Sequence, residues 1–388
     1  MELWALDQFT PIARLVGYTS VEVAERAVEV GGTGAWAVEM PLDEASGAAL
    51  KMLGATWPGI EVRDPTTGWR FGGYLTSATI VQTDDGDDVV RFAGSDFQSD
   101  LANWLEYPVA DDESLWWSTV VGGSLPLTTD ATNTVAANCG PPAPVGRRMV
   151  GLTIAPDDGL GPAKTRRLRG DTLMDVMGFL FAGTDYTARL RFRRSGNSTA
   201  GVEFSAFARP LASTVLEART GTFGRVEQTQ RAAPATSVVA MGALTGSIPE
   251  PDERLIRSTV VNEFDWRYRH REVFINRPST DSTAALTDEA LALVVDPVVS
   301  VKVDGARVEG FGATIDIGWW VNVRTRVAGV STLTQLPVVG SKLTYSPGAG
   351  WERTVDVGTE VPDGPAGMLA QVARVARRVR QVENELRT

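Results

Sequence analysis

The chain has 388 residues, of which 43% are hydrophobic and 22% charged, so its length allows roughly two to four folded domains. Its net charge of −11 argues against a general surface for binding nucleic-acid phosphates. The single cysteine, Cys139, excludes an intramolecular disulfide and a cysteine-based metal cluster. The N-terminus lacks the features of a signal peptide, and no run approaches the roughly 18 apolar residues of a membrane helix. We therefore expect a protein made in a cytoplasm that does not insert into membranes.

Alternating polar and apolar residues predict strands through residues 1–105, as in Trp36–Leu42, Ile60–Asp64 and part of Val89–Gly94. Gly72-Gly73 and Asp84–Asp88 are interpreted as turns between strands. One helix is expected to interrupt them; it is capped by Asp43, carries Ala45, Ala48, Ala49, Leu50 and Leu53, and ends at Gly54. We expect residues 1–110 to form a barrel or sandwich.

Residues 111–225 are predicted to form a loop-rich insertion with a small α+β part. The periodicity is lost over residues 110–165, which are rich in Gly, Pro and Asp, and we expect this segment to drape over another surface. A helix is predicted from Asp171 or Thr172 to Gly183. The alternating runs Tyr186–Phe192 and Val202–Phe207 predict a hairpin, with its turn at residues 195–198.

Residues 226–361 are again predicted to be mainly strands, including Ser237–Gly242 and Thr314–Ile317. A short helix is expected near Thr287–Val294. The sequence therefore predicts a mainly β fold with an α+β insertion, in which two β domains surround the insertion.

His270 is the only histidine and lies among arginines, which disfavour its protonated form. General-base catalysis also needs an oriented partner, so a surface position is the preferred interpretation. Asp84–Asp88 lacks the ligand spacing of an EF-hand, and Gly310-Phe311-Gly312 lacks the third glycine of a dinucleotide-binding loop. The sequence thus predicts no catalytic residue, no bound metal and no cofactor, although serine–lysine or carboxylate chemistry stays open.

Eleven tryptophans are many for a chain of this length, and they include the pairs Trp116-Trp117 and Trp319-Trp320, although core packing alone explains most of them. Neighbours on a strand point to opposite faces, so one of each pair is expected at the surface or in a subunit contact. Subunit interfaces are the preferred interpretation, with glycan stacking as the alternative. The clusters Arg147-Arg148 and Arg166–Arg169 are interpreted as ion-pairing residues.

Apolar residues in the C-terminal segment 362–388 recur at spacings of four and three, which is the pattern of a heptad repeat. Branched residues at both core positions favour three or more strands, and Arg378 and Glu383 fall where they would pair between parallel helices. A single amphipathic helix lying on its own domain is the alternative. The core positions of the predicted trimeric coiled coil are Met368, Val372, Val375, Val379, Val382 and Leu386.

The order of these parts resembles that of minor tail proteins of actinobacterial siphoviruses. These are hub or tail-associated proteins akin to the central baseplate hub of T-even phages. The resemblance is carried by the N-terminal segments Trp36–Leu53 and Ile60–Ile80, the helix–hairpin Gly170–Phe192, and the late strands Val298–Gly305 and Gly318–Gly329. It implies two barrel-like β domains per subunit, at residues 1–110 and 226–361, in a homotrimeric ring at the distal end of the tail.

The resemblance further implies a structural, non-enzymatic subunit that caps the tail tube and gates DNA passage without binding DNA specifically. Its expected partners are other copies of itself, distal tail and tail tube proteins, the tape measure protein, and receptor-binding or fibre proteins. Two other functions remain open: a carbohydrate- or receptor-binding β module with exposed tryptophans, and a virion-associated cell-wall hydrolase. Glycan binding would favour the first, and carboxylate-dependent activity on cell wall would favour the second.

Overall fold

The computed structural model separates the chain into two compact units. One comprises Met1–Val226 together with the chain from Lys302 onward, and the other comprises Glu227–Val301. The predicted domain boundaries are not tested by this division, which follows contacts rather than independent folding. The structure describes residues 1–31, 33–42, 47, 51–82, 88–106, 120–121, 123–164, 166–167, 171–181, 184–195, 199–217, 225–231, 237–244, 254–260, 272–276, 298–307, 314–327 and 330–358.

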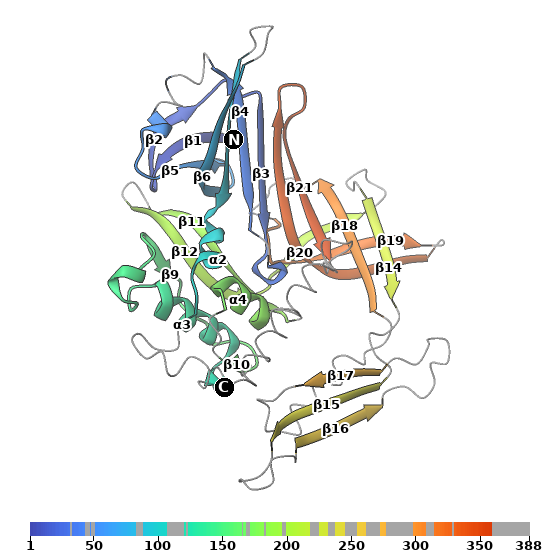
Figure 1. Cartoon of the computed structure of the whole chain (residues 1–388). Coiled ribbons are helices and arrows are strands. Elements are labelled where there is room, and N and C mark those ends of the chain that lie inside the picture. Colours follow the sequence, from blue (N-terminus) through green and yellow to red (C-terminus); the bar gives the residue numbers. More distant parts are fainter. Residues whose placement is uncertain are drawn as a thin grey trace. The chain divides into compact units, whose positions relative to one another are not determined.

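Seven N-terminal strands pair in the order β3-β4-β7-β6-β5-β1-β2, and each pair is antiparallel (Figure 1). Alternation explains why they form: in β4, Trp36, Val38 and Met40 are buried, whereas the residues between them are more exposed. The predicted strands in this region are therefore confirmed. The bounds are β1 Glu2–Asp7, β2 Thr10–Leu15, β3 Ser20–Arg26, β4 Ala35–Pro41, β5 Pro58–Arg63, β6 Arg70–Val81 and β7 Val89–Asp96.

The prediction that Gly72-Gly73 forms a turn is wrong, because both glycines lie buried inside β6. They are required by close packing rather than by chain reversal. A Cβ atom at Gly72 would lie 2.4 Å from Cε2 of Phe97 and 2.9 Å from Cγ of Phe192, and one at Gly73 would lie 2.3 Å from the carbonyl oxygen of Ser95. Because the glycines have no side chains, β6 can pack directly against Phe97 and Phe192 and against the backbone at Ser95.

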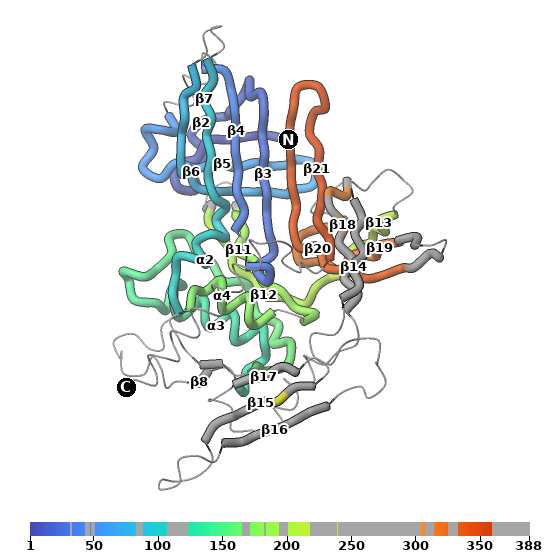
Figure 2. The backbone as a smooth tube through the Cα atoms, turned by 45° about the vertical axis from the view of Figure 1, so that its right-hand side comes forward, coloured from blue at the N-terminus to red at the C-terminus, as the bar shows by residue number. Residues whose placement is uncertain are grey.

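C-terminal strands extend the same sheet. The second half of β20 pairs with β3, with Leu343 opposite Val23, while its first half pairs with β19 (Figure 2). β21 and then β18 follow β20 in the sheet, and β13 pairs in parallel with β19. The bounds are β13 Leu211–Glu217, β18 Val298–Arg307, β19 Trp320–Val327, β20 Val330–Ser346 and β21 Gly350–Gly358.

The mainly β fold is confirmed, but the expected closure into barrels is not found among the described strands. The path of paired strands runs from β14 (Arg225–Arg231) through β18, β21, β20 and β3 to β2, whose one described partner is β1. Strands from both ends of the chain therefore belong to one sheet.

A smaller α+β part packs beside this sheet. The predicted hairpin is confirmed as β11 and β12, joined through residues outside the described ranges, and β9 adds to β12 in parallel. The predicted helix is confirmed as α4, whose first turn is capped by the Thr172 hydroxyl accepting from the Asp175 amide. The bounds are α2 Asp100–Asn103, α3 Leu127–Cys139, α4 Leu173–Phe181, β8 Val120–Val121, β9 Leu152–Ile154, β10 Arg166–Arg167, β11 Tyr186–Ser195 and β12 Thr199–Ala208, with 3-10 turns at Val28–Val30, Phe97–Ser99 and Val145–Arg147.

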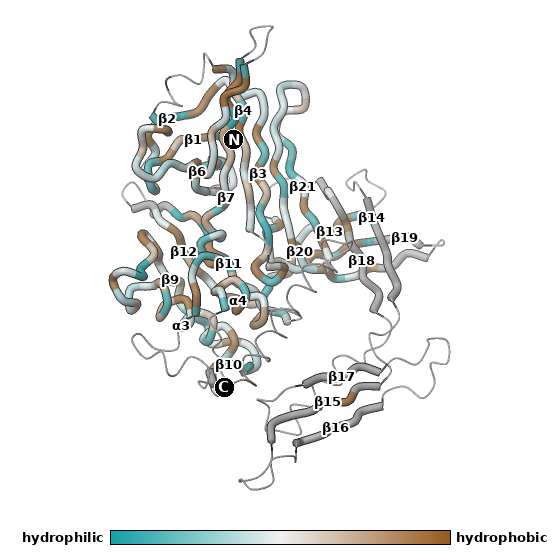
Figure 3. The backbone as a smooth tube through the Cα atoms, viewed as in Figure 1, coloured by the Kyte–Doolittle hydropathy of each residue, from teal (hydrophilic) through white to brown (hydrophobic). Residues whose placement is uncertain are grey.

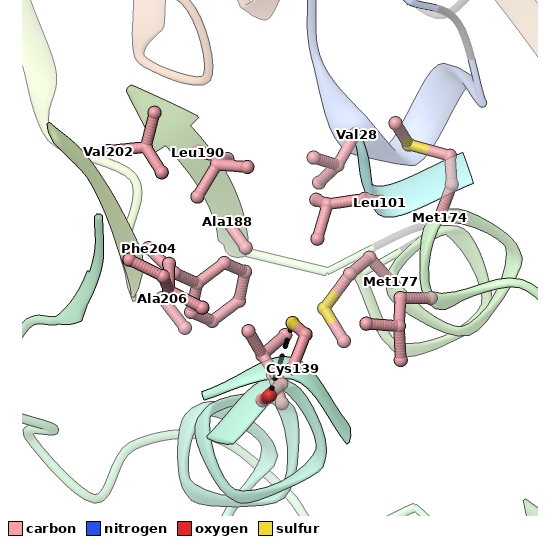
Figure 4. Close-up of a cluster of buried hydrophobic side chains, with 14 of the residues drawn as sticks. Val28, Leu101, Cys139, Met174, Met177, Ala188, Leu190, Val202, Phe204 and Ala206 are labelled. Atoms are coloured by element: carbon pink, nitrogen blue, oxygen red, sulfur yellow. Dashed lines mark hydrogen bonds between the residues drawn. The ribbon is translucent and has the colours of Figure 1, made fainter. Parts of the chain in front are cut away.

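The prediction that residues 110–165 are irregular is wrong where α3 forms. This polar segment forms a helix with a buried stripe of residues four apart, including Ala131, Val135 and Cys139. All three belong to the same buried cluster as Phe204, and Figure 4 labels Cys139 and Phe204 within it. Some of its buried polar groups bond within the helix, as where the Asn138 amide donates to the Thr134 carbonyl at 2.8 Å, whereas the Thr128 hydroxyl donates to the Leu160 carbonyl at 3.2 Å. The buried and exposed faces of α3 differ little in hydrophobicity, and this explains why the sequence shows no helical periodicity there.

The second unit contains three described strands in the order β16-β15-β17. β15 (Ser237–Leu244) confirms the strand predicted there; it pairs antiparallel with β16 (Arg254–Val260) and parallel with β17 (Glu272–Asn276). β14 (Arg225–Arg231) includes the boundary residue Val226. Most of the helix expected to begin at Asp43, and the helix expected at residues 287–294, lie outside the described residues.

We expect Phe204→Ala to lower the free energy of unfolding by about 3–5 kcal/mol, because it empties the centre of the core between α3 and β12. Phe179→Ala is the matched control: this ring on α4 is 48% exposed, and its loss should cost no more than about 1 kcal/mol. Urea unfolding of the full chain measures both. Equal losses would show that this core does not hold the α+β part together.

Candidate functional site

A buried ionic cluster joins the α+β part to the large sheet. The carboxylate of Asp316 is 2% exposed and accepts two hydrogen bonds of 2.7 Å from the guanidinium of Arg191. Arg189, two residues earlier on β11, donates a third at 2.9 Å. Burial alone would raise the pKa of Asp316, but the two guanidinium charges lower it below its ordinary value. Asp316 is therefore held as a carboxylate.

Asp316 lies in a segment that was predicted to be a strand, and that prediction is wrong. Residues 314–319 precede β19 without strand structure, and Gly318 has a φ of +80°. The amide of Ile317 donates to the Asp316 carboxylate at 2.9 Å. This local bond and the arginine pairs favour a bend over the extended ladder that the alternating sequence predicts.

A second ion pair lies beside the first. Arg209 and Glu29 approach to 2.8 Å with side chains only 3% and 10% exposed. The same guanidinium donates to the Gly318 carbonyl at 3.1 Å, and the hydroxyl of Thr187 donates to Glu29 at 2.9 Å. These contacts connect the 3-10 turn that follows β3, the α+β hairpin and the segment before β19.

Glu25 is the carboxyl of this region with the weakest pairing. It is half-buried on β3, and it accepts a hydrogen bond of 3.3 Å from the Ser341 hydroxyl. It lines a cavity of about 30 Å³ together with Asp96 and Arg191, which is room for about one or two water molecules. Burial raises the pKa of Glu25 to about 7, against the opposing charge of Arg191.

Two further carboxyls have structural roles. Asp96 ends β7 and accepts from the amides of Gly34 at 2.9 Å and Ser99 at 3.0 Å, so it caps the turn that follows. Asp100 accepts from the Tyr74 hydroxyl at 2.9 Å. Burial raises the pKa of Asp96 to about 7 and that of Asp100 to about 6. Both connect the sheet to the turn beneath it.

The described residues contain little that resembles reactive chemistry. Within the described ranges, no three His, Cys, Asp or Glu side chains are grouped so that they could hold a metal ion. The thiol of Cys139 is buried and donates to the Val135 carbonyl at 3.4 Å, and burial raises its pKa to about 12. His270 lies outside the described residues. Among the described helices, none combines the length and apolarity needed to cross a lipid bilayer.

The tryptophans with described side chains are mostly buried or half-buried. Trp57 is the most exposed of them, at 45%, whereas Trp319 and Trp320 are half-buried and Trp116-Trp117 lies outside the described ranges. The guanidinium of Arg209 lies 5.7 Å from the centre of the Trp320 ring. One exposed indole does not make a stacking platform, so these residues do not favour glycan binding.

The residues predicted to form the coiled coil cannot be located, because all of them lie outside the described ranges. They are Met368, Val372, Val375, Arg378, Val379, Val382, Glu383 and Leu386. The ionic cluster, in contrast, was not predicted. Its local signal was the repetition of arginine at residues 189, 191 and 193 on one face of a strand, but the partner Asp316 lies far away in the sequence.

Comparison with known proteins adds the family. A family profile described as Siphovirus ReqiPepy6 Gp37-like protein matches residues 1–295, which is most of the chain. The chain belongs to this siphovirus tail protein family. The resemblance predicted from the sequence is therefore confirmed at the level of the family. Comparison with curated protein sequences finds no match.

Three solved structures share the fold over nearly their whole length. The 43 kDa tail protein of prophage MuSo2 from Shewanella oneidensis has a TM-score of 0.56 and 14% identity, covering 92% of this chain and 97% of its own. A tail protein from Neisseria meningitidis MC58 has a TM-score of 0.53 and 12% identity, covering 92% and 96%. Prophage tail protein gp18 from Listeria monocytogenes EGD-e has a TM-score of 0.52 and 10% identity, covering 97% and 100%. Family and fold together support a structural role in a phage tail.

We expect Arg191→Ala to lower the free energy of unfolding by about 3 kcal/mol, because it leaves a buried carboxylate with Arg189 as its remaining guanidinium partner. Arg193→Ala is the matched control on the same strand: its side chain is 67% exposed and pairs with Glu203, so its loss should cost at most about 1 kcal/mol. Chemical unfolding measures both. Similar costs for the two variants would mean that the Asp316 cluster does not stabilise the fold.

The raised pKa of Glu25 predicts a pH-dependent stability. Its folded-state pKa of about 7 exceeds the unfolded value of 4.5, so the stabilisation by the bound proton is complete below about pH 4.5 and is lost as the pH rises through 7. Glu25→Gln mimics the protonated form and should raise the melting temperature at pH 8 more than at pH 5. Glu22→Gln, on the exposed face of β3, is the control. A pH-independent effect of Glu25→Gln would contradict the assignment.

Proposed function

We propose that this chain is a non-enzymatic hub subunit at the distal end of a siphovirus tail, where three copies form a ring. In this role it caps the tail tube, anchors receptor-binding or fibre proteins, and contacts the tape measure protein and the distal tail proteins. The observation that carries the proposal is the family membership, together with a fold shared with three prophage tail proteins over 92–97% of this chain.

The packing of the first unit supports the role of a subunit that keeps its shape within an assembly. A ring around a channel needs subunits that keep their shape while neighbouring parts of the tail attach to them. Pairing between β3 and β20 joins strands from the two ends of the chain, and the Arg191–Asp316 pair joins the hairpin to the segment before β19. These are long-range links within one compact unit, so separating its parts requires breaking many contacts at once.

The charge of the chain suits a passage for DNA. A net charge of −11 disfavours adhesion of phosphate, and a wall of lysines would hold the passing polymer. We therefore propose that acidic side chains predominate on the surface lining the ring and that DNA passes without specific binding. A mainly basic lining would contradict this part of the proposal.

The C-terminal segment 362–388 is proposed to form a short parallel trimeric coiled coil along the axis of the ring. Its support is the heptad pattern with branched residues at both core positions. A coil of about three heptads is marginal alone, so it should reinforce a trimer formed by the β region rather than create it.

Native mass spectrometry of the full chain, with negative-stain images of the particles, tests the ring. We expect a trimer at micromolar concentration. Deletion of residues 366–388 should leave the trimer intact but make it dissociate at lower denaturant concentration, because the coil contributes only part of the interface.

Val379→Asp provides a second variant that keeps the chain length. It should weaken the trimer as the deletion does, whereas Arg380→Asp, at a position outside the proposed core, should have a smaller effect. A full-length chain that remains monomeric at micromolar concentration would refute both the ring and the coil.

A further inference from the structure

The second half of β6 forms a sheet edge without a described partner. β5 pairs with β6 only as far as Tyr74, and a β-bulge follows between Leu75 and Ser77. From Ser77 to Val81 the ladder with β7 is regular, and every one of these residues is exposed. In the described part of the chain, no strand pairs with the other side of this segment.

Beyond the bulge before Ser77, this edge lacks the features that keep sheet edges apart in solution. Natural edge strands carry prolines, charged residues or bulges that block a further strand. β2, at the end of the same sheet, has Pro11 and Arg14, and β13 has a register shift after Leu211. Residues 77–81, in contrast, are Ser, Ala, Thr, Ile and Val, which are uncharged and mostly favourable in strands.

Side chains that lie opposite one another on neighbouring strands also become more exposed towards this edge. Met40, Val90 and Ile80 lie opposite one another on β4, β7 and β6, and their exposure rises from 0% through 2% to 58%. A further strand beside β6 would cover Ile80 and continue the row. Val81 is also 44% exposed, and Figure 3 shows the hydropathy along β6 and β7 in this part of the sheet.

We infer that the free edge Ser77–Val81 accepts an extended strand from a different protein of the tail, by β-strand addition. Each strand pair in this part of the sheet is antiparallel, so the added strand runs antiparallel to β6 and begins beside the connection to β7. That connection has the sequence Thr-Asp-Asp-Gly-Asp-Asp at residues 83–88. The donor strand therefore carries lysine or arginine at its N-terminal end, followed by alternating apolar residues.

A second copy of this chain fits the edge less well. Self-pairing of two β6 edges would place both acidic connections at opposite ends of the pair, where neither meets a basic residue. It would also produce a two-fold dimer, which is not the symmetry of the proposed ring. That the donor is a tail protein rests on the proposed function, whereas the strand-accepting edge rests on the geometry of β6 alone.

The test uses the full-length chain and a fluorescent synthetic peptide of about nine residues, with two lysines followed by alternating valine and threonine. Fluorescence anisotropy should show saturable binding, and a peptide with glutamates in place of the lysines should bind at least about tenfold more weakly. Hydrogen exchange should show new protection of amides within Ser77–Val81 when the lysine peptide is bound.

Ile80→Lys places a charge on the edge and should weaken binding of the lysine peptide by about tenfold or more. Val16→Lys is the matched control, because Val16 is also 58% exposed and lies beside the protected strand β2. Both variants change exposed residues, and unchanged melting temperatures would verify that they fold.

Absence of binding up to about 1 mM peptide, or equal binding by the Ile80→Lys variant, would overturn the inference. Loss of self-association in the Ile80→Lys variant would also overturn it, because the edge would then join two copies. Protection in the free chain of those amides of residues 77–81 that point away from β7 would mean that the chain covers its own edge, because the amides that point towards β7 are already bonded to it. A monomeric chain that binds the peptide would refute the proposed ring and leave the strand-accepting edge standing.

Discussion

The pairing of β20 with β3 is the interaction on which the first unit depends. It places Leu343 opposite Val23 and Gly340 opposite Arg26, so residues from the two ends of the chain share one ladder. β21 follows β20 in an antiparallel hairpin, and β19 precedes β20 and pairs antiparallel with its first half. Without this ladder the C-terminal strands would lose their connection to the N-terminal sheet, and the segment carrying Asp316 would lose its support.

The ionic cluster follows from that arrangement. The hairpin β11–β12 packs against the sheet through Phe192, next to Gly72 and Phe97, and this contact carries Arg189 and Arg191 towards the segment before β19. Strand alternation places Leu190 and Phe192 on one face of β11 and the arginines on the other. One face of β11 therefore packs into the hydrophobic core, and the other face carries the arginines that pair with Asp316.

Local features of this fold could be predicted from the sequence, whereas its long-range features could not. Alternation identified β4, β5, β7 and the β11–β12 hairpin, because polar and apolar residues alternate along each, even though in β5 both faces are buried. The same rule failed at Gly72-Gly73, where glycine serves close packing, and at Thr314–Ile317, where arginines from a distant strand bend the chain. It also failed at α3, whose small and polar residues give little hydrophobic contrast. The pairing of β3 with β20 leaves no local signal at all.

The buried charges restrict how the α+β part can pack against the sheet. A shift of the hairpin by one residue along β11 would turn Arg191 away from Asp316 and bring an apolar side chain to the carboxylate. An uncompensated buried charge costs several kcal/mol, which is a large share of the stability of a typical domain. Apolar packing alone tolerates such shifts far better, because Leu, Val and Phe can replace one another with a smaller loss. The cluster therefore selects one arrangement even though Glu25, with its raised pKa, makes the region less stable above neutral pH.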